Sequence, residues 1–225
     1  MRVNKTNVVQ STNLKKPIIH NVFIIDRSGS MSGSKYISAI KSVKTELELL
    51  SKDENSVFKN YVVEFDNSYE QPLRIKTHLW NSLDTQFKEA GASGGTPLYN
   101  TMGTIFKKLE SELKSDDRVL IKIFTDGGDT DNNKGEWNSN SIGVYTNKLI
   151  NINKWTITVN CTLTDKYAIL KMGIPESNIL CHNNTAEDIE RVSSLRTMSS
   201  LSYSKSVSMN VSADELKSNF YSKSI

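Results

Sequence analysis

Residues 17–30 read PIIHNVFIIDRSGS, an apolar run that stops at Asp26 and passes directly into a loop of serine and glycine. The run is short, rich in β-branched residues and apolar on both faces. This pattern is typical of a central parallel strand whose sheet is covered by helices on both sides. A strand that ends in a carboxylate followed by hydroxyls would carry these polar groups to the carboxyl edge of the sheet.

The segments that follow alternate between strand and helix patterns. Apolar residues recur at helical spacing between Ile37 and Leu50, which predicts a helix over residues 34–51 with Ser34 as its N-terminal cap. Further apolar runs predict strands at 61–65, 118–124, 155–161 and 179–181, and periodic stretches predict helices at 98–113, at 137–151, from 165 and from 185.

A turn is expected at Asp66-Asn67-Ser68, where it would join strand 61–65 to a second strand at 73–75. Pro72 would hold this second strand at the edge of the sheet. Strands that alternate with helices favour a parallel sheet with right-handed crossovers. We therefore expect an α/β fold with a doubly wound, mostly parallel six-stranded sheet, one antiparallel edge strand and helices on both faces.

The composition indicates one domain that needs no disulfide or metal to hold its core. The chain has 225 residues, with 28 Lys and Arg against 25 Asp and Glu, and a net charge of +3. The expected organisation is a polar leader over 1–16, a domain over 17–202 and a polar tail over 203–225. Cys161 and Cys181 lack metal-site and CxxC spacing, so both are expected to be free buried thiols.

The charge pattern and the hydropathy exclude two classes of partner. Basic residues are scattered along the chain, which gives no nucleic-acid footprint. No stretch approaches the roughly 20 apolar residues that span a bilayer, and residues 1–17 lack the apolar core of a signal peptide. We therefore expect a cytoplasmic protein that binds neither nucleic acid nor membrane.

Three polar loops stand where strands end or helices begin. They are Asp26-Arg27-Ser28-Gly29-Ser30 after the first strand, Gly94-Gly95-Thr96 before a helix, and Thr125-Asp126-Gly127 after strand 118–124. In an open α/β sheet such loops gather at the carboxyl edge, where ligands bind. Hydroxyls and carboxylates suit hard cations such as Mg²⁺, Mn²⁺ or Ca²⁺ and do not suit softer metals.

Asp-x-Ser-x-Ser, Gly-Gly-Thr-Pro-Leu and Thr-Asp-Gly, in this order, resemble the metal-ion-dependent adhesion site of the von Willebrand factor type A domain. The resemblance covers about residues 18–200. Its later part, with Gly173-Ile174-Pro175 and residues 185–188, is more similar to the soluble A-type domains of bacteria and phages than to the secreted animal ones. The resemblance implies a doubly wound sheet with a divalent cation at its carboxyl edge.

The resemblance also implies a role for each matching residue. Ser28 and Ser30 would contact the ion directly, and Thr96 would join them when a partner is engaged. Asp26 and Asp126 would act largely through water, or directly if the site rearranges.

The chemistry of the ion explains why a partner would bind there. Mg²⁺ takes about six oxygen ligands and gives up water reluctantly, so three hydroxyls and two carboxylates leave positions for water or an incoming acid. Two anionic charges leave a divalent ion electron-poor, which makes a partner's Asp or Glu a favourable further ligand. Arg27, Gly95 and Asp129 are expected on the rim that faces this partner. The leading expectation is a divalent-cation-dependent protein-interaction module.

Enzymatic alternatives fit the sequence less well. Aspartyl-phosphate enzymes carry a second Asp two residues after the nucleophile, where this chain has Ser28. Residues 29–35 depart from the spacing of a phosphate-binding P-loop. His20, His78 and His182 stand outside any hydrolase motif. We therefore expect a protein that is not an enzyme.

Two other functions stay open beside the leading expectation. Soluble A-type domains of bacteria and phages are frequently coupled to AAA+ ATPases, so the chain could be an adaptor or subunit of such a machine. It could also be a phage protein that binds a host component and counters host defence. Neither the fold nor a metal identifies the partner.

Overall fold

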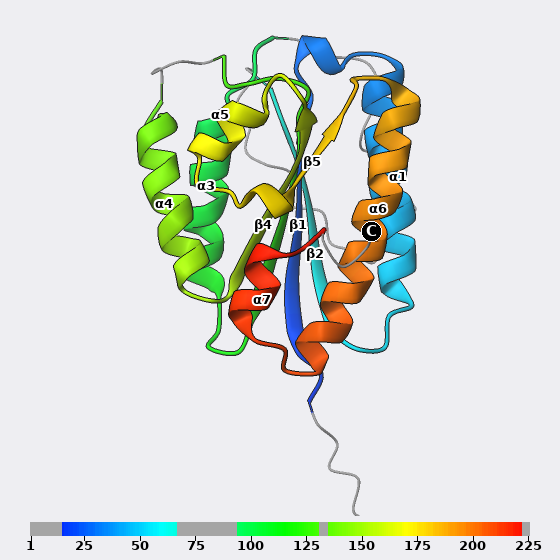
Figure 1. Ribbon diagram of the computed structural model, residues 1–225, viewed down its shortest axis with the longest axis vertical. Coiled ribbons are helices and arrows are strands. Elements are labelled where there is room, and N and C mark those ends of the chain that lie inside the picture. The colour runs from blue at the N-terminus through cyan, green and yellow to red at the C-terminus, as the bar shows by residue number, and fades with distance from the viewer. Residues whose placement is uncertain (1–14, 67–93, 131–134, 222–225) are drawn as a thin grey trace, which may run out of the picture.

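The computed structural model describes residues 15–66, 94–130 and 135–221, and a parallel sheet runs through its centre (Figure 1). Five strands follow the order β2-β1-β3-β4-β5, and all neighbours pair in parallel. Their bounds are β1 Ile18–Asp26, β2 Val57–Phe65, β3 Arg118–Phe124, β4 Trp155–Thr162 and β5 Ile179–His182. Because the strands share one direction, their carboxyl ends form a single edge, at the top of Figure 1.

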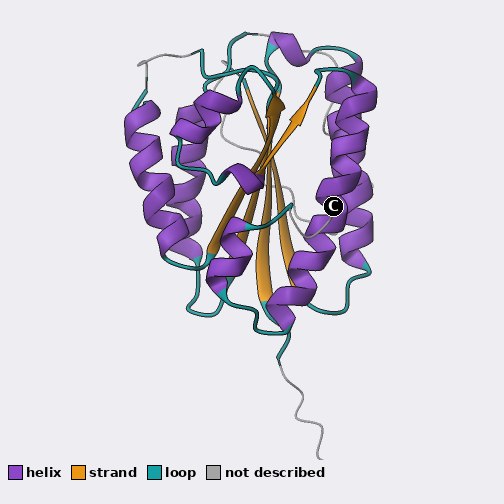
Figure 2. Ribbon diagram, in the orientation of Figure 1, coloured by secondary structure: helices purple, strands orange, loops and turns teal. Residues whose placement is uncertain are grey.

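Helices cover both faces of the sheet (Figure 2). Helices α1 and α6 lie side by side on one face, and α3, α4 and α5 lie on the other (Figure 1). None of the helices in the described ranges combines the length and hydropathy needed to cross a bilayer. The helices are α1 Ser34–Ser51, α3 Leu98–Glu112, α4 Ser139–Asn151, α5 Lys166–Lys171, α6 Ala186–Ser208 and α7 Ala213–Ser218, with 3-10 turns η1 Gly29–Met31 and η3 Glu176–Asn178.

Strand β1 contributes to a core on each face of the sheet. Val22 and Ile24 belong to the core under α3, α4 and α5. Phe23 and Ile25 belong to the core under α1 and α6. Successive side chains of a strand point to opposite faces, so a strand buried on both faces is apolar at most positions. This explains the mainly apolar run that ends at Asp26. The buried polar residues of β1, His20 and Asn21, are hydrogen-bonded to Asp117 and Asn60.

The structure confirms the expected α/β fold with a parallel sheet, but the sheet has five strands in the described residues, all parallel, where six were expected. The antiparallel edge strand expected at 73–75 lies outside the described residues. Strand β2 begins at Val57, four residues before the predicted start. Its first half mixes polar and apolar residues, so the sequence pattern does not show a strand there, but it pairs with β1 over its whole length. The predicted cap is wrong: Ser34 is the first helical residue, and Gly33 occupies the cap position with φ at 77°, which favours glycine.

The chain beyond residue 203 packs on the domain as far as Tyr221. Helix α6 continues to Ser208, so the expected boundary of a polar tail falls inside a helix. Phe220 and Tyr221 are buried, and the Phe220 amide donates to Asn178 Oδ1 at 3.0 Å. Two aromatic side chains and a buried hydrogen bond therefore fasten this segment to the sheet.

The two cysteines are free thiols, as expected. Cys161 is buried in β4 and Cys181 is half-buried in β5, where the two are direct register partners. Burial and the neighbouring Cys181 thiol raise the pKa of Cys161. Cys161 is therefore a protonated packing residue at neutral pH.

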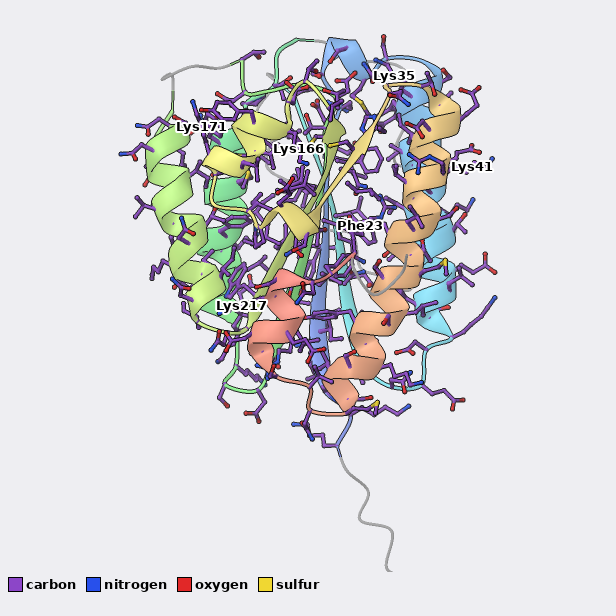
Figure 3. The ribbon with its side chains drawn as sticks, viewed as in Figure 1. Phe23, Lys35, Lys41, Lys166, Lys171 and Lys217 are labelled. Atoms are coloured by element: carbon purple, nitrogen blue, oxygen red, sulfur yellow. The ribbon has the colours of Figure 1, made fainter. Side chains whose placement is uncertain are left out.

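A buried ionic cluster connects the sheet to α1 and α6. Glu46 of α1 accepts hydrogen bonds from Lys122 of β3, from Arg196 Nε at 2.7 Å and from Ser200 Oγ at 2.6 Å. Burial would raise the pKa of Glu46, but the charges of Lys122 and Arg196 outweigh it and lower this pKa to about 2. Both cations also lie over the ring of Phe23, which is labelled in Figure 3. The carboxylate is therefore the shared anion of two buried cations.

Replacing Glu46 with Ala should strongly destabilise the fold. Lys122 and Arg196 would remain buried without a counter-ion, and loss of one partner from a buried pair costs about 3–5 kcal/mol. Urea denaturation measures this change in the free energy of unfolding. As a control, Glu48→Ala on the same helix removes only an exposed pair with Lys52 and should cost less than about 1 kcal/mol. Equal losses for the two variants would contradict this account of the cluster.

Candidate metal centre

Three loops meet at the carboxyl edge of the sheet, around the ends of β1 and β3. Asp26 closes β1, and its neighbours Ser28 and Ser30 lie in or beside the η1 turn. The Gly29 amide donates to the Gly94 carbonyl at 3.2 Å, which ties this loop to the segment before α3. The loop after β3 begins at Thr125. The parallel pairing of the strands therefore brings together the three loops that the sequence singled out.

Asp26 is completely buried and held by two hydrogen bonds. Its Oδ1 accepts from the Ser28 amide at 2.7 Å, and its Oδ2 accepts from Thr125 Oγ1 at 2.7 Å. Burial raises the pKa of Asp26 to about 6, against the lowering effect of these hydrogen bonds, and the nearby charge of Asp126 raises it further. The described residues thus orient this carboxylate without neutralising it.

Ser28, Ser30 and Asp126 form a continuous chain of oxygen atoms. Ser28 Oγ lies 3.0 Å from Ser30 Oγ, and Ser30 Oγ donates to Asp126 Oδ1 at 2.6 Å. Adjacent ligands of Mg²⁺, each 2.0–2.1 Å from the ion in an octahedron, are about 2.9 Å apart. The two serine hydroxyls already have this spacing, so the donor set fits a small hard cation.

Thr96 lies in the second loop, and its backbone is fixed by Thr130. The Thr96 amide donates to Thr130 Oγ1 at 2.6 Å, and the Thr130 amide donates back to the Thr96 carbonyl at 3.0 Å. Thr96 is buried, two residues after the Gly94 carbonyl that contacts Gly29. The structure brings this loop against the serine loop, while no hydrogen bond in the described residues joins the Thr96 side chain to either serine.

The expected rim residues have partners within the chain. Arg27 donates from Nε and Nη2 to Asp66 Oδ2, at 2.9 and 2.7 Å. Asp129 Oδ1 accepts from the Tyr99 amide at 3.2 Å, in the first turn of α3. Gly95 is half-buried between Gly94 and Thr96. Arg27 and Asp129 therefore stabilise the loops around the site.

Sequence reasoning gave no role to two residues that hold the site together. Thr125 Oγ1 lies 2.7 Å from both Asp26 Oδ2 and the Gly127 carbonyl, which share its single hydroxyl proton, so Thr125 links the ends of β1 and β3. The Lys35 ammonium donates to Asp126 Oδ2 at 2.6 Å. The position of Thr125 directly before Asp126 could have indicated its role. For Lys35, the signal was a cation in the first turn of a helix, where the helix dipole disfavours positive charge.

Of the described histidines, His20 lies near the start of β1, whereas His182 lies close enough to the site for Asp126, Lys35 and the Thr125 backbone to affect its pKa. His20 Nε2 is 2.9 Å from Asp117 Oδ2, and its ring stacks on Tyr61. The His182 ring stacks on Phe124, and burial lowers its pKa. His78 lies outside the described residues.

Replacing Asp26 with Asn should stabilise the protein at neutral pH in the presence of a chelator. The raised pKa means that this carboxyl contributes stability below its unfolded pKa of 3.8 and loses it as pH rises through about 6. The amide of an asparagine at this position would not ionise, so Asp26→Asn should be more stable than the parent by about 1–3 kcal/mol at pH 7.5. The difference should shrink toward pH 4, as measured by urea denaturation.

The exposed Asp116 provides a control for this comparison. Asp116→Asn should change stability by less than about 0.5 kcal/mol at either pH. A difference between Asp26→Asn and the parent that is the same at pH 4 and pH 7.5 would show that desolvation does not raise the pKa of Asp26.

Comparison with known proteins finds solved structures with a similar fold. No protein-family model and no curated protein matches the chain. Proximal thread matrix protein 1 from the mussel byssus matches with a TM-score of 0.59 at 13% identity, over 83% of this chain and 46% of that one. The PilB minor pilin from Streptococcus sanguinis matches with a TM-score of 0.55 at 12% identity, over 84% of this chain and 62% of that one.

A third match carries the domain type in its name. The ArnB paralog VWA2 from Sulfolobus acidocaldarius matches with a TM-score of 0.51 at 18% identity, over 81% of this chain and 45% of that one. The chain thus spans less than two thirds of the length of these structures. At such identities the likeness concerns the fold alone, and it supports the expected fold: this chain has a von Willebrand factor type A-like α/β architecture.

Proposed function

We propose that this chain is a protein-interaction module that holds a divalent cation, with Mg²⁺ as the first choice, and presents it to an acidic side chain of a partner. The observation that carries the proposal is the chain of oxygens from Ser28 through Ser30 to Asp126, with adjacent atoms 3.0 and 2.6 Å apart. These oxygens lie at the carboxyl edge of a doubly wound sheet, where ligands of such folds bind.

Each residue of the site has a proposed part. The hydroxyls of Ser28 and Ser30 would hold the ion directly, with Thr96 joining from the second loop. Asp126 and Asp26 would supply negative charge, largely through water. The bound ion would supply a positive centre that accepts a further carboxylate oxygen. Within the chain, the burial of Asp26 and its bond to Thr125 would keep this charge fixed beneath the site.

Apolar side chains next to the site support a role in protein binding. A Cβ placed on Gly128 would lie 3.6 Å from Asp165 Oδ1, so the loop after β4 adjoins the loop of Asp126. Around Asp165, Leu163 and Tyr167 each expose 69% of their surface. Exposed large apolar residues beside a polar centre are a common feature of partner-binding surfaces.

We also propose that the site binds without catalysing a reaction. Ser28 stands where an aspartyl-phosphate enzyme would need an acid, and a hydroxyl with an ordinary pKa cannot act as a general acid at neutral pH. Binding of a partner's carboxylate to the ion, in contrast, needs only hydroxyls, carboxylates and an accessible rim.

Isothermal titration with MgCl₂ tests the metal site. The parent chain should give a saturable heat, and Ser30→Ala should weaken the affinity at least about tenfold, because one of the proposed direct ligands is lost. Asp126→Asn should have an effect of similar size. Ser32→Ala is the matched control, since Ser32 is exposed in the same loop and should leave the affinity unchanged. A parent chain without any saturable heat for Mg²⁺, Mn²⁺ or Ca²⁺ would refute the proposed function.

Affinity capture from the native host, with Mg²⁺ or with a chelator, tests the partner. The expected result is a protein that is retained in Mg²⁺, released by the chelator and not retained by the Ser30→Ala chain. Retention that is equal under both conditions would contradict a metal-mediated contact. An AAA+ ATPase among the chelator-sensitive proteins would identify the module as an adaptor of such a machine.

A further inference from the structure

Lys35 places a positive charge at the proposed metal site. Its ammonium donates to Asp126 Oδ2 at 2.6 Å, and its side chain is 20% exposed while that of Asp126 is fully buried. Lys35 is the second residue of α1, at the end of the helix nearest the carboxyl edge of the sheet (Figure 3). A flexible cation thus reaches the same carboxylate that the divalent ion would use.

The position of Lys35 is unfavourable without that carboxylate. The first turn of a helix carries a partial positive charge from its unpaired amides. No acidic residue stands in the first turn of α1 to offset this charge. The pair with Asp126 therefore accounts for the placement of the lysine.

The two oxygens of Asp126 are divided between two donors. Oδ1 accepts from Ser30, which belongs to the proposed ligand set, and Oδ2 accepts from Lys35. A divalent ion near Ser30 would share one carboxylate with an ammonium a few ångströms away. The two positive charges would repel each other and compete for one anion.

Arg27, a further cation near the site, is in a different situation. Arg27 pairs with Asp66, and Glu64 lies 3.9 Å from its Nη1. Neither acid belongs to the proposed ligand set. Removal of the Arg27 charge would therefore change the site less directly than removal of the Lys35 charge.

We infer that Lys35 competes with the divalent cation for Asp126 and thereby weakens and sets the affinity of the site. The inference rests on the proposed function, because it assumes a metal held by Ser28, Ser30 and Asp126. The lysine acts on the metal through Asp126 and is a positioning residue. Binding of the ion would then release the Lys35 ammonium from Asp126, and the partly exposed Lys35 side chain could turn toward solvent.

Titration of the full chain with MgCl₂ tests this inference through the affinity itself. Lys35→Met keeps the length of the side chain and removes its charge, so Mg²⁺ should bind at least about tenfold more tightly than to the parent. Lys35→Gln should tighten binding in the same direction. Lys35→Arg keeps the charge and should stay within about threefold of the parent.

Lys41→Met is the matched control. Lys41 lies on the same helix with its side chain 70% exposed and pairs with the exposed Glu190 at 3.3 Å (Figure 3). This variant removes an equal charge without touching Asp126, so it should leave Mg²⁺ affinity within about twofold of the parent. If Lys35→Met and Lys41→Met both bound Mg²⁺ more tightly than the parent, the cause would be net charge, and the proposed role of Lys35 would be overturned. Circular dichroism and thermal melting confirm that each variant is folded.

The outcomes separate this inference from the proposed function. Saturable binding by the parent with tighter binding by Lys35→Met supports both. Binding by the parent with equal or weaker binding by Lys35→Met and Lys35→Gln overturns the inference and leaves the metal site standing. Binding by Lys35→Met alone supports the competition and refutes a metal-bound parent chain. No binding by any variant refutes both.

Discussion

The site depends on the parallel pairing of β1 with β3. This pairing sets Ile25 beside Phe124, so the two strands end together and their following loops share one edge of the sheet. Thr125 then donates to Asp26 across 99 residues of sequence and locks the ends at 2.7 Å. Parallel strands alone would only bring the loops near each other. The buried hydrogen bond fixes the relative position of the carboxylates of Asp26 and Asp126, and with it the geometry of every oxygen around them.

Two buried carboxylates in this protein have opposite electrostatic surroundings. Glu46 is neutralised by Lys122 and Arg196, and its pKa falls to about 2. Asp26 has hydrogen bonds but no ion-pair partner among the described residues, and its pKa rises to about 6. A buried charge that is oriented but not neutralised is more frequent at functional sites than in structural clusters. This contrast separates the acid that holds helices to the sheet from the acid that belongs to the candidate site.

The sequence predicted the parts of the structure that follow from local pattern. Strand β3 matches its predicted bounds, and β1 begins and ends one residue later than the apolar run 17–25, because mainly apolar runs can be buried on both faces. The three loops of the site could be predicted because strand ends in such a sheet converge. The contacts of Lys35 could not, since they depend on tertiary placement. The packing of residues 203–221 could not be predicted either, because most of this segment is polar and only a few aromatic side chains, such as Tyr221, bury it against the sheet.

The strand order has a consequence for how the protein is made. Of the described strands, β1 is synthesised before the others, yet its place is between β2 and β3, and its partner β3 is synthesised about a hundred residues later. Such nonlocal contacts form slowly, because a long loop must close before they give any stability. A nascent chain that ends before Asp126 therefore lacks one residue of the proposed ligand set. An ion held as proposed would need β1 and β3 to be paired first, so it would stabilise the assembled sheet and would not nucleate its folding.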